Sequence, residues 1–154
     1  MSILVLDLKK SDELRDEYIK SFIDTSSSYY KEDIEQKTLF SDGFCYIGYL
    51  WDCLLKPTII SEYKANHFLE DKGIVYIMWD IHSSERIFID DYWKFPKNQI
   101  LCTDEKIESL KSNLPEDIYV FDDTFSWTVV FTHEYNEKNR RYCLFMDANK
   151  GVII

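Results

Sequence analysis

Two short segments of the sequence combine a carboxylate with a histidine. Asp80 and His82 stand two positions apart after a run of apolar residues, and His133 and Glu134 are adjacent near the end of another such run. Imidazole nitrogens and carboxylate oxygens bind divalent metals and also act as general acids and bases. If both runs are strands whose ends converge, these four residues form a weak candidate for a metal or hydrolytic site.

The spacing of these residues specifies such a site only weakly. The patterns His-x₃-His, His-Glu-x-x-His and Cys-x-x-Cys are absent, and four glycines cannot supply a phosphate-binding loop. A lone histidine near a sheet is more often a hydrogen-bonded structural residue than a ligand, since metal ligands come in clusters. We therefore expect structural roles for His82 and His133, and we predict no cofactor, no metal and no catalytic residue.

Further carboxylates occur as the adjacent pairs Asp90-Asp91 and Asp122-Asp123. Neighbours in a strand point to opposite faces, so neither pair makes a two-carboxylate active site, and turn capping is the simpler role. The alternative is an acidic rim at one end of a sheet that binds a basic partner around an aromatic anchor. The candidate partner-binding residues are Asp80, His82, Glu85, Asp90, Asp91, Tyr92, Trp93, Asp122, Asp123 and Glu134.

A predicted meander of three strands positions His133 and Glu134. Apolar and β-branched residues predict strands at Ile118–Phe121, Ser126–Glu134 and Tyr142–Met146, joined by polar turns. Alternation places His133 on the face of the second strand that looks like core, and the opposite face is mixed, as expected for partial cover. The core-like face consists of Trp127, Val129, Phe131 and His133.

Asp80 follows the continuously apolar run Ile74–Trp79, which is typical of a strand buried on both faces. A turn at His82–Glu85 and a strand at Arg86–Asp91 are expected next. Ile3–Leu8 is a short strand or an ordered arm.

Helical spacing of apolar residues predicts the remaining elements. Ser11, Ser61 and Thr103 are expected N-caps, and a further helix is expected from Phe44 until Pro57. Together these elements predict a single α+β domain over residues 1–154, with an antiparallel sheet of about five strands and three or four helices.

Composition limits the class of function. The chain has 154 residues, of which 45% are hydrophobic, so one folded domain is expected. A net charge of −10 should repel nucleic acid and anionic membranes and attract basic proteins. No stretch approaches a membrane helix or a signal peptide, and the four unpaired cysteines suit a reducing compartment. We expect a cytoplasmic monomer or weak dimer.

Two stretches of the sequence carry a family resemblance. The first joins YLWDCLLKPTIIS to VYIMWDIHSSERIFIDDYWKFP, and the second is LPEDIYVFDDTFSWTVVFTHE. Over Tyr49 to Glu134 the chain resembles small bacterial immunity-type proteins of polymorphic or contact-dependent-inhibition toxin systems, which share a Phe-Asp-(Asp/Glu)-x-Phe-x-Trp-Thr strand followed by Thr-His-Glu. The resemblance implies a bacterial cytoplasmic protein that neutralises a toxin, and it transfers no functional residue.

Three hypotheses of function follow. In the first, the chain is an acidic immunity protein that binds a cognate toxin domain, a basic protein of nuclease type, and does not turn over a substrate. In the second, it is a metal-dependent hydrolase or nuclease that uses Asp80, His82, His133 and Glu134. In the third, it mimics nucleic acid with arrayed carboxylates, although lysines such as Lys64 and Lys111 interrupt the acidic residues.

Overall fold

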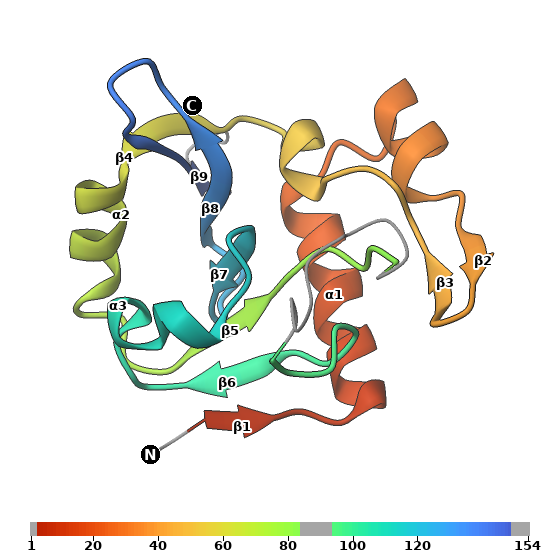
Figure 1. The fold of residues 1–154 in the computed structure, drawn as a ribbon, viewed down its shortest axis with the longest axis horizontal. Coiled ribbons are helices and arrows are strands. Elements are labelled where there is room, and N and C mark those ends of the chain that lie inside the picture. Colours follow the sequence, from red (N-terminus) through yellow and green to blue (C-terminus); the bar gives the residue numbers. More distant parts are fainter. Residues whose placement is uncertain (1–2, 84–93, 149–154) are drawn as a thin grey trace.

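The structure, a computed structural model, describes residues 3–83 and 94–148. A seven-stranded sheet forms the centre, and all its described pairings are antiparallel. Figure 1 shows helix α1 on one side of this sheet and helices α2 and α3 on the other. The α+β class and the antiparallel sheet are confirmed, but the sheet has seven strands instead of about five.

The bounds of the elements follow the chain. The strands are β1 (Ile3–Val5), β2 (Thr38–Phe40), β3 (Gly43–Cys45), β4 (Thr58–Ser61), β5 (Val75–Met78), β6 (Leu101–Thr103), β7 (Ile118–Phe121), β8 (Trp127–Tyr135) and β9 (Arg141–Asp147). The helices are α1 (Leu8–Phe22), α2 (Glu62–Leu69) and α3 (Ile107–Leu110), with a π-helical turn η1 (Tyr30–Ile34) and 3₁₀ turns η2 (Leu50–Cys53) and η3 (Lys111–Asn113).

The strand order of the large sheet is β1-β6-β5-β7-β8-β9-β4, and β2 and β3 form a separate hairpin. The predicted meander β7-β8-β9 and the inner position of β5 are confirmed. The additional strands β4 and β6 have four and three residues, too few for alternation to reveal them in the sequence. The strand expected at Arg86–Asp91 lies outside the described residues.

Both faces of β8 are buried from Trp127 to Thr132, so the second face is covered over most of its length and exposed at Glu134. Trp127, Val129 and Phe131 pack beneath α2 and α3. Val130 packs beneath α1 on the other face, where the Tyr18 hydroxyl lies 2.8 Å from Thr128 Oγ1. Helix α1 therefore supplies the cover that alternation along β8 alone could not predict.

Three predictions about helices are wrong and one is confirmed. Asp7, not Ser11, is the N-cap of α1, and Lys106, not Thr103, precedes α3. Ser61 caps α2 as predicted, accepting a hydrogen bond from the Lys64 amide. The helix expected from Phe44 is instead strand β3 followed by the short turn η2, because the segment is anchored by tertiary hydrogen bonds described below.

Ser11 is fully buried and ties α1 to the sheet. Its hydroxyl accepts a hydrogen bond of 2.8 Å from the Ile100 amide, directly before β6, and lies 3.4 Å from the Leu6 carbonyl oxygen. We expect Ser11→Ala to lower the free energy of unfolding by about 1–3 kcal/mol, because the buried Ile100 amide loses its acceptor. Urea denaturation measures this change. Ser109→Ala, at an exposed serine, is the control, and an equal effect of both substitutions would contradict the assignment.

None of the described helices combines the length and the apolar character that crossing a bilayer requires.

Candidate functional site

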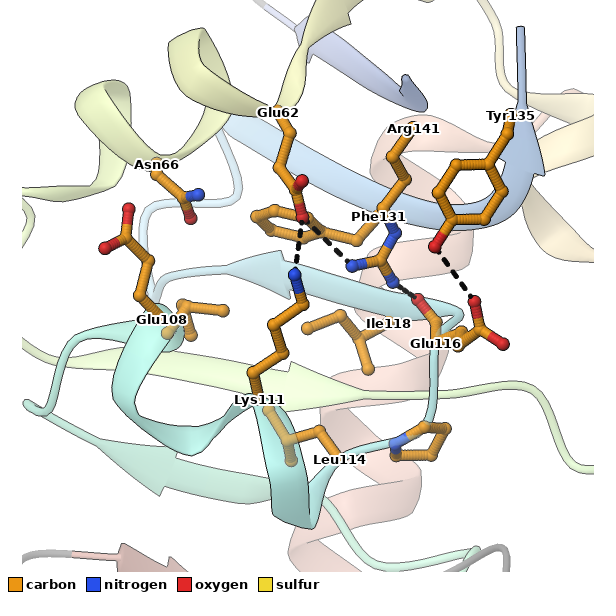
Figure 2. Close-up of a pocket in the computed structure, with 12 residues that line it drawn as sticks. Glu62, Asn66, Glu108, Lys111, Leu114, Glu116, Ile118, Phe131, Tyr135 and Arg141 are labelled. Atoms are coloured by element: carbon orange, nitrogen blue, oxygen red, sulfur yellow. Dashed lines mark hydrogen bonds and ion pairs between the residues drawn. The ribbon is translucent and has the colours of Figure 1, made fainter. Parts of the chain in front are cut away.

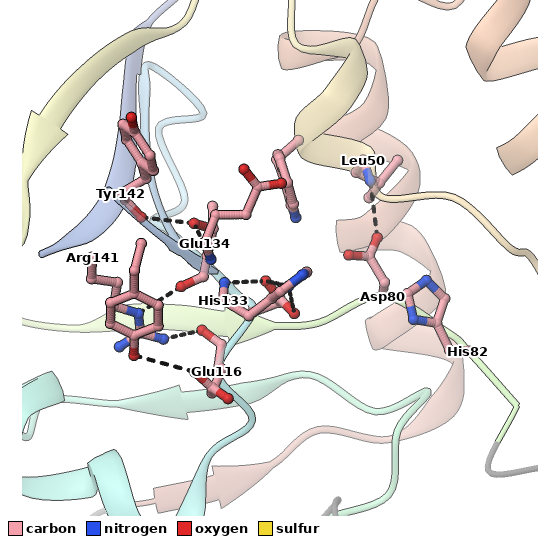
Figure 3. A network of polar contacts seen from close by, with 12 residues as sticks. Leu50, Asp80, His82, Glu116, His133, Glu134, Arg141 and Tyr142 are labelled. Atoms are coloured by element: carbon pink, nitrogen blue, oxygen red, sulfur yellow. Dashed lines mark hydrogen bonds and ion pairs between the residues drawn. The ribbon is translucent and has the colours of Figure 1, made fainter. Parts of the chain in front are cut away.

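The ends of three neighbouring strands converge at one end of the sheet. Asp80 follows β5, Asp117 precedes β7, and His133 lies in the last part of β8. The pairings Met78 with Tyr119 and Ile118 with Phe131 bring these positions to the same end. The Asp80 and His133 strand ends therefore converge, which was the condition set for a site there, and Figure 3 shows the polar contacts around them.

Asp80 is buried and satisfied by hydrogen bonds. Its carboxylate accepts bonds from the Tyr46 hydroxyl at 2.7 Å, the Leu50 amide at 3.0 Å and the Tyr119 hydroxyl at 2.7 Å. The Tyr119 hydroxyl accepts in turn from the Trp51 amide at 3.0 Å. Asp80 thus fixes the segment from Tyr46 to Trp51 against the sheet, which explains why that segment is not a regular helix.

Burial makes the ionisation of Asp80 less favourable than that of a carboxyl group in water. Burial raises the pKa of Asp80, while nearby His82 and the three hydrogen bonds act in the opposite direction. Burial and the neighbouring Asp80 also raise the pKa of Tyr46 and Tyr119 well above the usual value, so both tyrosines remain hydrogen-bond donors. With 5% of its surface exposed, Asp80 cannot contact a partner directly.

His82 is held by a backbone carbonyl. Its Nε2 lies 2.7 Å from the Gly48 carbonyl oxygen, which can only accept, so Nε2 carries the proton. The ring also meets Tyr46 and Tyr49 edge-on, at centroid distances of 5.8 and 4.8 Å. A proton fixed on Nε2 makes that nitrogen unsuitable as a metal ligand.

Gly48 allows this segment to pack closely. A Cβ atom at this position would lie 2.7 Å from the Tyr29 hydroxyl oxygen and 2.9 Å from the Asp33 Cβ. We expect Gly48→Ala to cost about 1–3 kcal/mol in folding free energy because one of these neighbours must move. Thermal denaturation is the measurement, and Ala65→Gly on α2 provides a comparison at a buried position elsewhere. Unchanged stability of Gly48→Ala would show that the packing is looser than described.

His133 pairs with a carboxylate that the sequence analysis did not identify. Asp117 accepts from the His133 amide at 2.8 Å, and its Oδ2 lies 2.9 Å from the His133 Nδ1. Burial raises the pKa of Asp117, and contact with His133 lowers it in part. The His133 side chain is 42% exposed, and no hydrogen bond joins its Nε2 to another residue in the described ranges.

A β-bulge explains where His133 points. The register of β8 against β9 shifts between Phe131 and Tyr135, and such irregularities redirect side chains. His133 therefore does not share the face of Phe131, as alternation predicted, but meets Tyr49 and Trp51 at ring-centroid distances of 5.4 and 6.2 Å.

The result is a surface formed by Tyr49, Trp51, Asp52, His133 and Glu134, called here the Tyr49 surface. The Tyr49 ring contacts both His82 and His133 and lies 5.2 Å from that of Trp51. Asp52 and Glu134 carry exposed carboxylates. Partial burial raises the pKa of Asp52, a hydrogen bond from the Tyr29 hydroxyl lowers it in part, and the nearby Glu134 charge raises it further. The aromatic rings of this surface are half-buried, rest on the residues beneath them and have carboxylates beside them. Such a surface suits binding of another protein better than catalysis on a substrate.

The weak candidate for a metal site gains no support from this arrangement. The two histidines both contact Tyr49, but Asp80 is buried and one nitrogen of each imidazole ring is already hydrogen-bonded. Within residues 3–83 and 94–148, no three His, Cys, Asp or Glu side chains are arranged to hold a metal ion.

The predicted acidic rim is divided by the fold. Asp122 and Asp123 follow β7 and so lie at the opposite end of that strand from Asp117 and the Tyr49 surface. Asp122 instead accepts from the Thr124 amide and from Trp127 Nε1, at 3.0 Å each, which is the turn-capping role considered from the sequence. The remaining candidates Glu85, Asp90, Asp91, Tyr92 and Trp93 lie outside the described residues.

Sequence reasoning missed the residues that organise this site, which are Tyr46, Gly48, Tyr49, Asp117 and Tyr119. A signal was available for Asp117, because it immediately precedes a strand adjacent to that of His133. A signal was also available for Gly48, since an isolated glycine away from a turn often marks a place where the backbone closely approaches another part of the chain. The tyrosines gave no signal, because buried tyrosines are common in cores.

Comparison with known proteins finds no matching family model, no similar curated protein and no similar solved structure, so the resemblance to immunity-type proteins stays a prediction.

Proposed function

We propose that this chain is an acidic immunity-type protein that binds and neutralises a basic toxin domain, of nuclease type, through the Tyr49 surface. The observation that carries the proposal is the fixed pair of Tyr49 and Trp51, held over the buried Asp80 network with exposed carboxylates beside them. Aromatic anchors that are rigid before binding lose little conformational entropy on association. The net charge of −10 favours a basic partner and fast association.

The test is co-expression with the product of the adjacent gene. We expect a stoichiometric complex that survives purification and relieves the toxicity of that product. Tyr49→Ala should weaken the complex by about 30-fold or more, as truncation of an aromatic hot spot does. Tyr63→Ala, at an aromatic residue of α2 that is 77% exposed, should leave affinity unchanged. A partner that binds both variants equally well, or does not bind the chain at all, would contradict the proposal.

The second candidate is a hydrolase, and the Asp117–His133 pair is the observation that favours it. A carboxylate that fixes the Nδ1 side of a histidine leaves Nε2 free to act as a general base. This candidate predicts turnover of a substrate by the purified chain and its loss in His133→Ala, whereas the binding proposal predicts no turnover. The nucleic-acid mimic ranks below both, because Lys111, whose side chain is 65% exposed, pairs with Glu62 and interrupts the negative surface.

A further inference from the structure

A cavity of about 550 Å³ lies between α2, α3 and the strands β7, β8 and β9. This volume is within the usual range for pockets that bury a ligand. Figure 2 shows its side chains converging from both helices and from the sheet. The cavity is distinct from the Tyr49 surface but adjacent to it, because Glu116 and Tyr135 line the cavity and their chain neighbours Asp117 and Glu134 belong to the site above.

The cavity has an apolar floor and a charged rim. Ile118 and Phe131 of the sheet, with Ile107 of α3 and Leu114 after η3, form the apolar floor and walls. Glu62, Glu108, Lys111, Glu116 and Arg141 provide the charged groups. Such walls accept the methylene stem of a long side chain, whose polar end would reach the rim.

The cations of this rim are already engaged. Arg141 is 7% exposed at its side chain, and its Nη1 lies 3.2 Å from Glu62 Oε2. Its Nε donates to the Thr132 carbonyl oxygen at 2.7 Å and its Nη2 to the Glu116 carbonyl oxygen. Lys111 also pairs with Glu62, at 3.3 Å. An anionic ligand would have to displace one of these contacts.

The carboxylates are less fully engaged. Glu108 is exposed and has no hydrogen-bond partner among the residues that the structure describes. The Glu116 carboxylate accepts, within the described part of the chain, a single hydrogen bond, which is 3.3 Å long and comes from the Tyr135 hydroxyl. The charged groups of the rim that remain available to a ligand are therefore carboxylates. These accept hydrogen bonds and complement a cationic donor.

We propose that this cavity binds the side chain of a lysine or arginine of the protein partner, together with an adjoining apolar residue. The inference rests on the proposed function, since it supplies a second anchor beside the Tyr49 surface for the same basic protein. The methylene stem would pack on Phe131 and Ile118, and the cationic end would reach the carboxylate of Glu108 or that of Glu116, which lie on opposite sides of Lys111 and Arg141 (Figure 2). The volume exceeds that of one side chain, which leaves room for the apolar neighbour.

The test uses two capped dipeptides, acetyl-Leu-Arg-amide and its neutral isostere acetyl-Leu-citrulline-amide, followed by amide chemical shifts in NMR. We expect saturable shifts confined to the cavity, around Leu110, Ile118 and Phe131, with the citrulline peptide binding at least about tenfold more weakly, a loss of about 1.4 kcal/mol. The double variant Glu108→Gln/Glu116→Gln should lose the preference for arginine. Glu13→Gln/Glu17→Gln on α1 is the matched control and should keep it.

Equal binding of the two peptides, shifts outside the cavity, or an unchanged preference in Glu108→Gln/Glu116→Gln would overturn the inference. These outcomes are separate from those for the proposed function. If the adjacent gene product binds through Tyr49 but the dipeptides do not bind, the cavity inference alone fails. If the dipeptides bind as expected but no toxin domain does, the proposed function fails and the cavity remains a site for cationic side chains.

Discussion

Asp80→Ala is expected to lower the free energy of unfolding by about 3–5 kcal/mol. The substitution removes the acceptor of the Tyr46 hydroxyl, the Leu50 amide and the Tyr119 hydroxyl at once. Each donor is buried beneath α1, so water cannot replace the lost carboxylate without opening the core. Urea denaturation at neutral pH measures the change, and the Tyr49 surface should lose its order with it.

Asp80→Asn removes the titratable group of this side chain while keeping nearly the same shape. The amide keeps one acceptor and most of the volume, so the cost should be smaller than that of alanine. Because burial raises the folded-state pKa of Asp80, the part of its stabilisation that depends on protonation is complete below the ordinary value of 3.8 and is lost as pH rises through the raised value. As pH rises above 3.8 the wild type should therefore lose more stability than Asp80→Asn, and parallel curves would contradict the raised pKa.

Arg141→Met should cost about 2–4 kcal/mol of folding free energy. Arg141 joins three parts of the fold through Glu62 of α2, the Thr132 carbonyl oxygen in the bulge of β8 and the Glu116 carbonyl oxygen before β7. Methionine retains the packing on Phe131 but leaves these acceptors without their donor. The loss should be measured by chemical denaturation.

Arg140→Met is the matched control, because the neighbouring side chain is exposed in the turn between β8 and β9. It should change stability by less than about 0.5 kcal/mol. A similar loss in both variants would show that charge in this turn, and not the network of Arg141, determines the effect.

The sequence predicts the elements that local pattern specifies. Ile118–Phe121 coincides with β7, and the apolar run around Ile77 is an inner strand buried on both faces, as expected. Ser61 caps α2 because an isolated serine before an amphipathic segment is a local signal. Patterns of this kind depend on neighbours in the chain, which the sequence displays directly.

The elements that tertiary contacts specify were not predictable in the same way. The segment after Phe44 has helical spacing, yet the hydrogen bond of Leu50 to Asp80 and that of Trp51 to Tyr119 hold it in an irregular path. Ser11 resembles an N-cap but bonds to Ile100, which is 89 positions away. In both cases a long-range partner outweighs local preference.

Asp80, His82 and His133 were candidates from the sequence, but the contacts that hold them were not predictable from it. Their strand ends lie at the same end of the sheet, which was a condition for the site and not a prediction. The bulge in β8 turns His133 toward Tyr49, and Asp117 occupies its Nδ1, and neither feature follows from alternation. Predicting that the acidic residues are divided between the two ends of the sheet requires knowledge of the strand pairing, which residue types alone do not specify.

Long-range electrostatic attraction between this acidic chain and a basic toxin domain is the central claim, and the salt dependence of their association rate tests it most directly. Stopped-flow measurement with the adjacent gene product at 50 and 500 mM NaCl should show the association rate constant fall by about 10- to 1,000-fold, with a much smaller change in the dissociation rate. An association rate that does not change with salt, or a partner that never associates, would contradict the account.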